Sequence, residues 1–224
     1  KPLADLHGKP MIQVVYEHVQ EADLQDIAVA TDHELIAQCV QKFGGKVVMT
    51  SPSHPSGTDR CGEAASKMQL SDDDVVINIQ GDEPFISKKE LELLKLLFDN
   101  PNVNIATLVK PFQSTQEAQN PNKVKVVLSS SHKALYFSRF AIPFVRDANQ
   151  PEPTYYQHLG IYAYRYHTLK ELIKLKPSNL EQSEKLEQLR WLENDYTIYA
   201  APCDYQGIGI DTPEDLANLL KIKQ

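Results

Sequence analysis

Two kinds of hydrophobic pattern alternate along the first hundred residues. Segments with apolar residues on one helical face are predicted to form helices at 10–22, 33–43, 57–68 and 87–98. Short apolar runs between them are predicted to form strands at 27–31, 46–50 and 75–80. The last run is rich in β-branched residues, which is typical of a strand buried on both faces of a parallel sheet. This alternation predicts an α/β fold with a doubly wound, mostly parallel sheet.

The pattern changes after Asn104. Strands with short helical pieces between them are expected at 105–109, 124–128, 135–139 and 159–164. Helices return at 168–175 and 184–193. We therefore expect one domain over 1–224, in which 1–103 is mainly a nucleotide-binding half. The mixed half at 104–224 completes the sheet and adds an acceptor site.

Composition narrows the functional class. A chain of 224 residues is long enough to bury a sizeable core, and its net charge of −7 does not favour nucleic acid or an anionic membrane as a partner. No apolar run approaches the roughly 18 residues that a membrane span needs. The three cysteines, Cys39, Cys61 and Cys203, are scattered and lack CxxC spacing. This pattern indicates a protein of the reducing cytoplasm without a zinc site.

The run at 75–80 ends in Gln80-Gly81-Asp82-Glu83-Pro84. Gly81 allows a sharp turn and a close approach of the backbone to a ligand. Asp82 follows the carboxyl end of a predicted buried strand, the edge where open α/β sheets bind their ligands. A carboxylate there suggests Mg²⁺ and a phosphate ester, and the alternative is an aspartate that only stabilises its own turn.

A second carboxylate, Asp211, follows the glycine-rich stretch 207–209. The next residues are explained by helix capping, with Thr212 as the N-cap and Pro213 in the first position of a helix. Asp211 has no such explanation. Asp82 and Asp211 are therefore candidates to share one or two magnesium ions.

Three further segments carry polar groups at the ends of elements. The hydroxyls and first-turn N–H groups of 53–60 are suited to a phosphate or a base edge, or they form an ordinary helix cap. Arg139 ends a strand and is suited to a carboxylate or phosphate, or to a surface salt bridge. His158 and Tyr162 share one face of a strand. No GxSxG nucleophile and no GxxxxGK[ST] loop is present, so neither a covalent serine intermediate nor a Walker-type kinase is indicated.

Taken together, these motifs resemble the 3-deoxy-manno-octulosonate cytidylyltransferase family. The resemblance is colinear from end to end, and it is carried by KPL at 1–3, ATDH at 30–33, HPSGTDR at 54–60, NIQGDEP at 78–84, VKVV at 124–127, ALYFSR at 134–139, HLGIYAYR at 158–165, LEQLR at 186–190 and GIDTPEDL at 209–216.

The resemblance implies a Rossmann-like fold of the nucleotide-diphospho-sugar transferase type. It also implies a homodimer that uses Mg²⁺ to convert CTP and 3-deoxy-D-manno-octulosonate (Kdo) into CMP-Kdo and pyrophosphate for lipopolysaccharide biosynthesis. The half at 104–224 would then supply sugar-acid binding and dimerisation.

Site residues follow from the resemblance position by position. Asp82 and Asp211 would bind the metal and, with Lys1, act in catalysis. The residues expected to contact CTP are Lys1, Ser56, Gly57, Thr58, Arg60, Gln80, Gly81 and Asp82. Those expected to surround the sugar acid are Gln80, Arg139, Arg146, His158, Tyr162, Glu187 and Gln188.

In-line attack of the sugar's anomeric hydroxyl on the α-phosphorus needs positioning and charge neutralisation more than a covalent intermediate, which suits two acids on a metal and a few cations. Two other functions stay open: a cytidylyltransferase for an amino-Kdo or a sialic acid, and a nucleotide-binding protein without turnover. The family begins with a strand and an arginine-containing loop ahead of Lys1. We therefore expect on the order of 15–20 further residues there, with at least one Arg.

Overall fold

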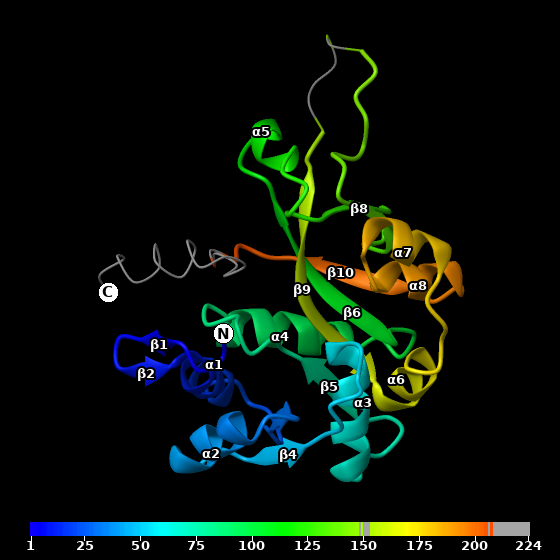
Figure 1. Ribbon diagram of the computed structural model, residues 1–224. Helices are drawn as coiled ribbons and strands as arrows, with labels where there is room; N and C mark the ends of the chain where they lie inside the picture. Colours follow the sequence, from blue (N-terminus) through cyan, green and yellow to red (C-terminus); the bar gives the residue numbers. More distant parts are fainter. Residues whose placement is uncertain (148, 150–152, 206, 208–224) are drawn as a thin grey trace. The chain divides into compact units, whose positions relative to one another are not determined.

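The computed structural model describes residues 1–147, 149, 153–205 and 207 (Figure 1). The elements in chain order are β1 (Asp5–Leu6), β2 (Lys9–Pro10), α1 (Met11–Gln20), β3 (Val29–Thr31), α2 (Glu34–Lys42), β4 (Val47–Met49), α3 (Gly57–Lys67), β5 (Val75–Asn78), α4 (Lys88–Leu97), β6 (Ile105–Pro111), α5 (Thr115–Ala118), β7 (Lys125–Leu128), β8 (Ala134–Ser138), β9 (Tyr156–Arg165), α6 (Tyr166–Leu172), α7 (Asn179–Glu184), α8 (Gln188–Glu193) and β10 (Ile198–Pro202).

The chain forms two compact units that interleave in sequence. The first contains 1–70, 78–92 and the described residues from 205 onward, and the second contains 71–77 and 93–204. The segments 71–77 and 93–103 thus belong with the second unit, although sequence patterning grouped them with the nucleotide-binding half. The predicted organisation as one domain stays a prediction.

The first unit consists mainly of amphipathic helices and a short parallel strand pair. Helix α1 buries Met11, Ile12, Val15, Tyr16 and Val19, as its periodicity predicted. Strands β3 and β4 pair in parallel, and β1 and β2 form a short antiparallel hairpin. The predicted helices at 10–22, 33–43, 57–68 and 87–98 are confirmed within two residues at each end.

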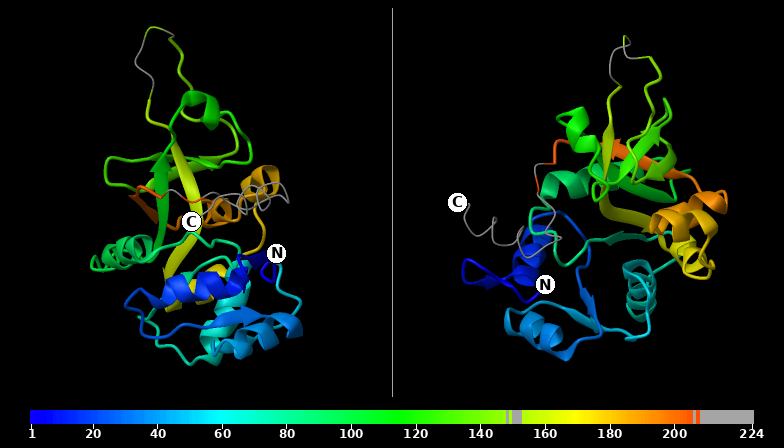
Figure 2. Two further views of the ribbon diagram at one scale, coloured as in Figure 1. Left: turned by 90° about the vertical axis from the view of Figure 1, so that its left-hand side faces the viewer. Right: turned by 45° about the horizontal axis from the view of Figure 1, so that its top comes forward.

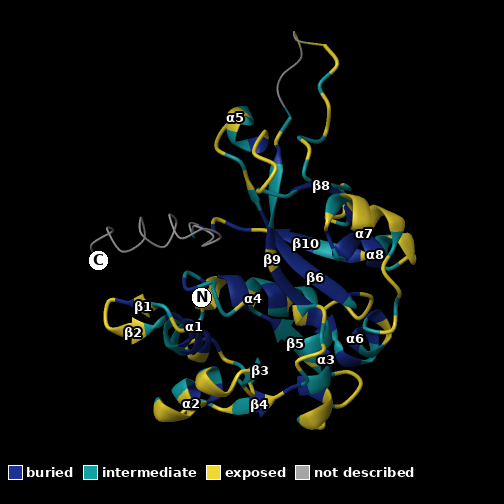
Figure 3. Ribbon diagram, in the orientation of Figure 1, coloured by how far each residue is buried: buried dark blue, intermediate teal, exposed yellow. Residues whose placement is uncertain are grey.

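The second unit is built on a mixed sheet with strand order β10-β6-β9-β7-β8, and β5 also pairs with β9. Strands β10 and β6 are parallel, whereas the β6–β9, β7–β9 and β7–β8 pairs are antiparallel. Figure 2 shows β9, in yellow, running beside the green β6. The first five residues of β6 are all buried (Figure 3), so these two strands carry the core of the unit.

The expectation that 75–80 is buried on both faces is wrong. Strand β5 ends at Asn78, which is its one buried residue, and Val75 is 36% exposed. The strand begins directly after a turn closed by Asp74, whose carboxylate accepts from the backbone N–H of Ser71. Residues 71–73 of that turn are exposed, so solvent reaches the start of the strand. Direct pairing of β3 with β5 would leave no place between them for a strand from ahead of Lys1. Strand β3 pairs instead with β4, and β5 with β9, so the expected upstream strand stays a prediction.

The predicted helix at 184–193 corresponds to α8, which starts only at Gln188, and α7 at 179–184 was not predicted. Helix α7 begins with a reciprocal capping box between Ser178 and Glu181. It ends at Lys185, whose left-handed backbone (φ 54°, ψ 46°) stops the helix before α8 begins at Gln188. Strand β10, which follows α8, had no counterpart among the predicted elements.

Candidate nucleotide-binding and sugar-binding residues

In the first unit, the N-terminal loop lies against the turn that contains Gly81 and Asp82. The backbone N–H of Ile12 donates to the carbonyl of Pro2 (2.9 Å), which fixes the loop on the start of α1. A Cβ at Gly81 would lie 3.2 Å from Cδ1 of Ile12, so the turn packs closely on that helix. Nζ of Lys1 is 3.8 Å from Oδ2 of Asp82, and the two side chains are 45% and 35% exposed. A cation and a carboxylate are thus presented side by side.

The start of α3 lies against the same turn. Ser56 caps this helix, because its hydroxyl accepts from the backbone N–H of Asp59 (3.2 Å) and donates to the Asp59 carboxylate (2.6 Å). A Cβ at Gly57 would lie 3.3 Å from Nε2 of Gln80. The absence of a side chain at Gly57 therefore allows two predicted CTP segments, 56–60 and 80–82, to approach each other.

Arg60 links the ends of the parallel strands to α3. Its guanidinium donates to the Thr50 hydroxyl (2.7 Å) and pairs with the Asp32 carboxylate (3.0 Å). These partners immediately follow β4 and β3, respectively. Arg60 thus orders the edge beside the predicted nucleotide segments, and its direct contact with CTP stays a prediction. Thr58 is buried in α3.

Glu63 is an organising residue that the sequence reasoning missed. Its carboxylate accepts from the backbone N–H of Ser51 (2.8 Å), from the ammonium of Lys67 (2.7 Å) and from the ring Nε2 of His54. The Lys67 contact, with help from the other two donors, lowers the pKa of Glu63 from 4.5 to about 2. Only the Glu63–Lys67 spacing of four residues is visible in the sequence. Glu63 fixes the loop that leads into Ser56.

In the second unit, His158 and Tyr162 come together on β9. Their ring centroids are 5.2 Å apart, and the Tyr162 ring meets Trp191 edge to face at 5.0 Å. Burial lowers the pKa of His158 from 6.5 to about 3 and raises that of Tyr162 well above 10, with Tyr164 and Glu187 adding to the second effect. The Tyr162 hydroxyl and the Trp191 indole N–H are buried without hydrogen-bond partners in the described chain.

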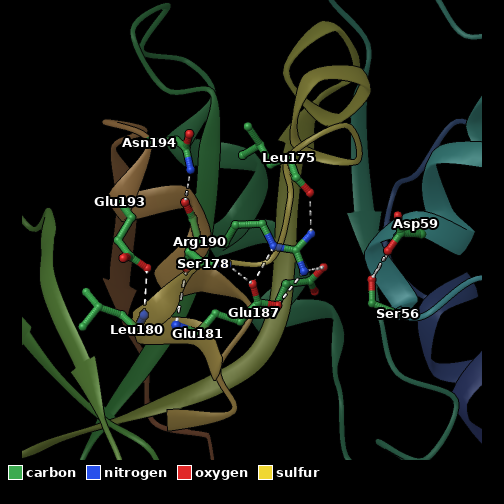
Figure 4. A network of polar contacts seen from close by, with 10 residues as sticks. All are labelled: Ser56, Asp59, Leu175, Ser178, Leu180, Glu181, Glu187, Arg190, Glu193 and Asn194. Carbon is green, nitrogen blue, oxygen red and sulfur yellow. Dashed lines mark hydrogen bonds and ion pairs between the residues drawn. The ribbon is translucent and has the colours of Figure 1, made fainter. Parts of the chain in front are cut away.

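Glu187 and Gln188, both predicted to bind sugar, lie at the start of α8. Gln188 is buried, and Glu187 is 4.0 Å from the guanidinium of Arg190. The Arg190 guanidinium also donates to both carboxylate oxygens of Glu181, at 2.5 and 2.7 Å, and to the carbonyl of Leu175. Figure 4 shows these contacts. This network joins α7 to α8 and sets the orientation of the α8 N-terminus beside Trp191.

Arg139 has a structural role in addition to its predicted role in binding the sugar acid. Its guanidinium donates to the backbone carbonyls of Glu184 (2.7 Å), Pro121 (3.1 Å) and Lys185 (3.4 Å). Its backbone N–H donates to the Glu184 carboxylate (2.9 Å). Part of its donor capacity is therefore used within the protein, and its contact with the sugar acid stays a prediction. Arg146, the other predicted sugar-binding arginine, is exposed.

Asp211 and the capping residues after it lie outside the described residues. Within 1–147, 149, 153–205 and 207, no group of three or more His, Cys, Asp or Glu side chains is placed to hold a metal ion. No helix in the same ranges has the length and apolar character to cross a bilayer.

Comparison with known proteins gives consistent matches over most or nearly all of the chain. The family model described as Cytidylyltransferase matches residues 1–198. The 3-deoxy-manno-octulosonate cytidylyltransferase of Bacteroides thetaiotaomicron is 54% identical, over 96% of this chain and 88% of the relative. The enzyme of the same name from Parabacteroides distasonis is 50% identical, over 98% of this chain and 90% of the relative.

Solved structures show the same relationship. A CMP:2-keto-3-deoxy-manno-octonic acid synthetase complexed with CTP has a TM-score of 0.92 and 43% identity, over 98% of this chain and 90% of that one. A 4-diphosphocytidyl-2C-methyl-D-erythritol synthase from Anaerococcus prevotii has a TM-score of 0.63 at 12% identity, over 98% of this chain and 91% of that one, and shares the fold. The predicted nucleotidyltransferase α/β fold is thereby confirmed.

Proposed function

Because the chain belongs to the 3-deoxy-manno-octulosonate cytidylyltransferase family, which transfers CMP from CTP to Kdo, we propose that it does so with Mg²⁺ bound by Asp82 and Asp211. The observation that carries the proposal is the grouping, within the first unit, of three segments that the sequence assigned to CTP. Lys1 lies 3.8 Å from Asp82, and Gly57 lies against Gln80.

The Asp82 side chain fits a magnesium ligand. Its carboxylate supplies the hard oxygen atoms that Mg²⁺ prefers, and it is half-exposed at a turn rather than buried in a structural ion pair. When bound there, the metal would neutralise charge on the triphosphate and on the leaving pyrophosphate. Lys1 would add a positive charge beside the same phosphates.

Binding of the two substrates divides between the two units. Gln80, Gly81 and the start of α3 at Ser56–Arg60 would hold CTP through polar groups and first-turn N–H groups. Arg139, Arg146, His158, Tyr162, Glu187 and Gln188 would surround the sugar acid. The reaction is attack of the sugar's anomeric hydroxyl on the α-phosphorus with departure of pyrophosphate.

Pyrophosphate release from CTP is the direct test. We expect release with Kdo, little with UTP in place of CTP, and loss in EDTA with recovery on added Mg²⁺. Efficient turnover with an amino-Kdo or a sialic acid, and not with Kdo, would instead establish the alternative substrate. CTP binding by calorimetry without pyrophosphate release from any acidic sugar would establish a nucleotide-binding protein without turnover.

We also propose a cytoplasmic homodimer that serves lipopolysaccharide biosynthesis. No disulfide joins Cys39, Cys61 and Cys203, in keeping with a reducing compartment. Phe140 and Phe144 are 82% and 86% exposed, and a second copy of the chain is the partner we propose for them.

Light scattering after size exclusion tests the dimer. We expect twice the mass of the chain, and a monomer for the double variant Phe140→Ser, Phe144→Ser. The control Leu96→Ser removes a 61%-exposed apolar residue from α4 and should remain dimeric. A monomeric parent protein would contradict the proposal.

A further inference from the structure

The register of β9 against β6 breaks at one point. Thr107 pairs with Tyr162, whereas the next residue of β6, Leu108, pairs with Leu159. Gly160 and Ile161 therefore have no partner on β6, and β9 bulges by two residues. A bulge of this kind re-aims the side chains on either side of it.

The bulge shortens the separation between His158 and Tyr162. In a regular strand, residues four apart are separated by roughly 13 Å. Here their partners on β6 are Val109 and Thr107, which are two apart, or about 7 Å along a strand. The two rings consequently touch, with centroids 5.2 Å apart.

The Thr107 hydroxyl occupies the centre of this bulge. Thr107 is fully buried, and its Oγ1 lies 2.8 Å from the carbonyl oxygen of Ile161 and 3.1 Å from that of Leu159. Both partners only accept hydrogen bonds, and a hydroxyl proton turned away from them would leave the lone pairs of Oγ1 facing two carbonyl oxygens. The arrangement that satisfies most of these groups therefore points the proton toward a carbonyl. The lone pairs of Oγ1 are then left to accept.

His158 supplies the donor for those lone pairs. Its Nε2 lies 3.2 Å from Oγ1 of Thr107. If Nε2 carried no proton, two acceptors would face each other, since the hydroxyl proton is already committed to a carbonyl. Nε2 therefore carries the proton in the neutral ring. Nδ1 has no hydrogen-bond partner among the residues that the structure describes.

We propose that Thr107 is a positioning residue, which holds His158 in the Nε2–H tautomer and leaves Nδ1 to accept a hydrogen bond from a hydroxyl of the sugar acid. The inference deepens the proposed function and rests on it for the identity of the ligand. Burial lowers the pKa of His158 to about 3, so the ring is neutral at pH 7. It thus selects for a hydroxyl donor and leaves the carboxylate of the sugar to the arginines.

The first test reads the tautomer directly. Long-range ¹H–¹⁵N correlation spectra distinguish protonated from unprotonated ring nitrogens, and the His158→Gln variant assigns the signal. We expect Nε2–H with unprotonated Nδ1 in the parent protein and in Thr107→Ser, and a mixture of tautomers in Thr107→Val. A parent protein with Nδ1–H, or a Thr107→Val spectrum unchanged from the parent, would overturn the assignment of Thr107. The parent and Thr107→Ser spectra decide the point even if Thr107→Val folds poorly.

Steady-state kinetics provide the second test. Loss of one oriented hydrogen bond predicts a sugar KM about tenfold higher in Thr107→Val, near-parent values in Thr107→Ser and an unchanged KM for CTP. The expected tautomer together with an unchanged sugar KM in Thr107→Val would overturn the role of His158 toward the sugar. Absence of pyrophosphate release from the parent protein would instead refute the proposed function, while the spectra would still test the tautomer.

Discussion

At the scale of single residues, Asp82 and Arg139 differ in how far their side chains are bonded within the protein. The Asp82 carboxylate is half-exposed at the end of a turn, and its one ion pair among the described residues, to Lys1, spans 3.8 Å. Arg139 also ends a strand, but its guanidinium is bonded to three backbone carbonyls. Substitution of Asp82 should therefore change mainly catalysis, whereas substitution of Arg139 should change both substrate binding and the stability of the protein.

Asp82→Asn should lower kcat/KM by roughly a hundredfold or more, because loss of a metal ligand removes several kcal/mol of transition-state stabilisation. The same is expected of Asp211→Asn. The melting temperature should hardly change, since Asp82 has no buried partner among the residues that the structure describes. Asp26→Asn removes an exposed ion pair with Lys46 and serves as the control, with activity near that of the parent protein. Near-normal turnover of Asp82→Asn at saturating Mg²⁺ would refute the metal assignment.

Arg139→Lys should raise the KM for the sugar more than that for CTP, because an ammonium cannot reproduce the two-pronged grip of a guanidinium on a carboxylate. It should also destabilise the protein by about 1–3 kcal/mol through carbonyls left without donors. Initial-rate kinetics and urea unfolding separate the two effects.

Arg165→Lys is the matched control for Arg139. The Arg165 guanidinium also donates to three backbone carbonyls, those of Val103, Asp73 and Phe98. We expect a similar loss of stability without a change in the sugar KM. Equal effects of the two substitutions on the sugar KM would reduce Arg139 to a structural residue.

At the scale of elements, the junction between α7 and α8 places the sugar-binding candidates Glu187 and Gln188. Lys185 adopts a left-handed conformation there, which costs a residue with a Cβ roughly 1–2 kcal/mol. The carbonyls of Glu184 and Lys185 then face Arg139, and α8 starts in a new direction. Hydrogen bonds of Arg190 offset this local cost. Arg190, in α8, donates to Glu181 of α7 and to the carbonyl of Leu175, and these bonds hold the two helices together.

Lys185→Gly should stabilise the protein by about 0.5–1 kcal/mol, since glycine adopts this conformation without strain and this gain exceeds the added freedom of the unfolded chain. The side chain is exposed, so little packing is lost. Lys185→Ala keeps the Cβ and is the control, with no gain expected. A urea midpoint for Lys185→Gly at or below that of Lys185→Ala would show that the junction is unstrained.

At the scale of the whole molecule, His158 and Glu63 are two of the groups whose lowered pKa makes stability depend on pH in the same direction. The pKa of His158 is lowered from 6.5 to about 3 by burial, and that of Glu63 is lowered from 4.5 to about 2 by its hydrogen bonds, that to Lys67 first. In each case the unfolded chain binds the proton more readily than the folded protein. Stability should therefore fall as pH decreases from 6.5 for His158 and from 4.5 for Glu63.

Urea midpoints between pH 7 and pH 5 separate the contribution of His158 from that of Glu63, because Glu63 is still ionised in both states over most of that range. We expect the free energy of unfolding to fall by at most about 1.4 kcal/mol per pH unit from this group. His158→Gln removes the titrating ring and should flatten the profile between these pH values. A variant whose midpoint falls as steeply as that of the parent protein would assign the effect to other groups.

Local signals were sufficient for much of the fold and part of the site. The periodicity of α1 and the Ser56 cap of α3 are both short-range features, and the structure confirms them. The colinear motifs, Gln80–Pro84 among them, indicated the family that the comparisons establish. Such features depend on residues within a few positions of each other, and the order of residue types records them directly.

Other features depend on contacts between residues far apart in the sequence. The bulge that joins His158 to Tyr162 arises from the pairing of β9 with Thr107, about fifty positions away, and Arg139 meets the carbonyl of Glu184 across 45 positions. The partial exposure of β5 and the break at Lys185 were likewise missed, because propensity says little about which surfaces neighbouring elements cover. Hydrophobic periodicity specifies which face of an element is apolar, but the register between elements is chosen only when the whole sheet packs.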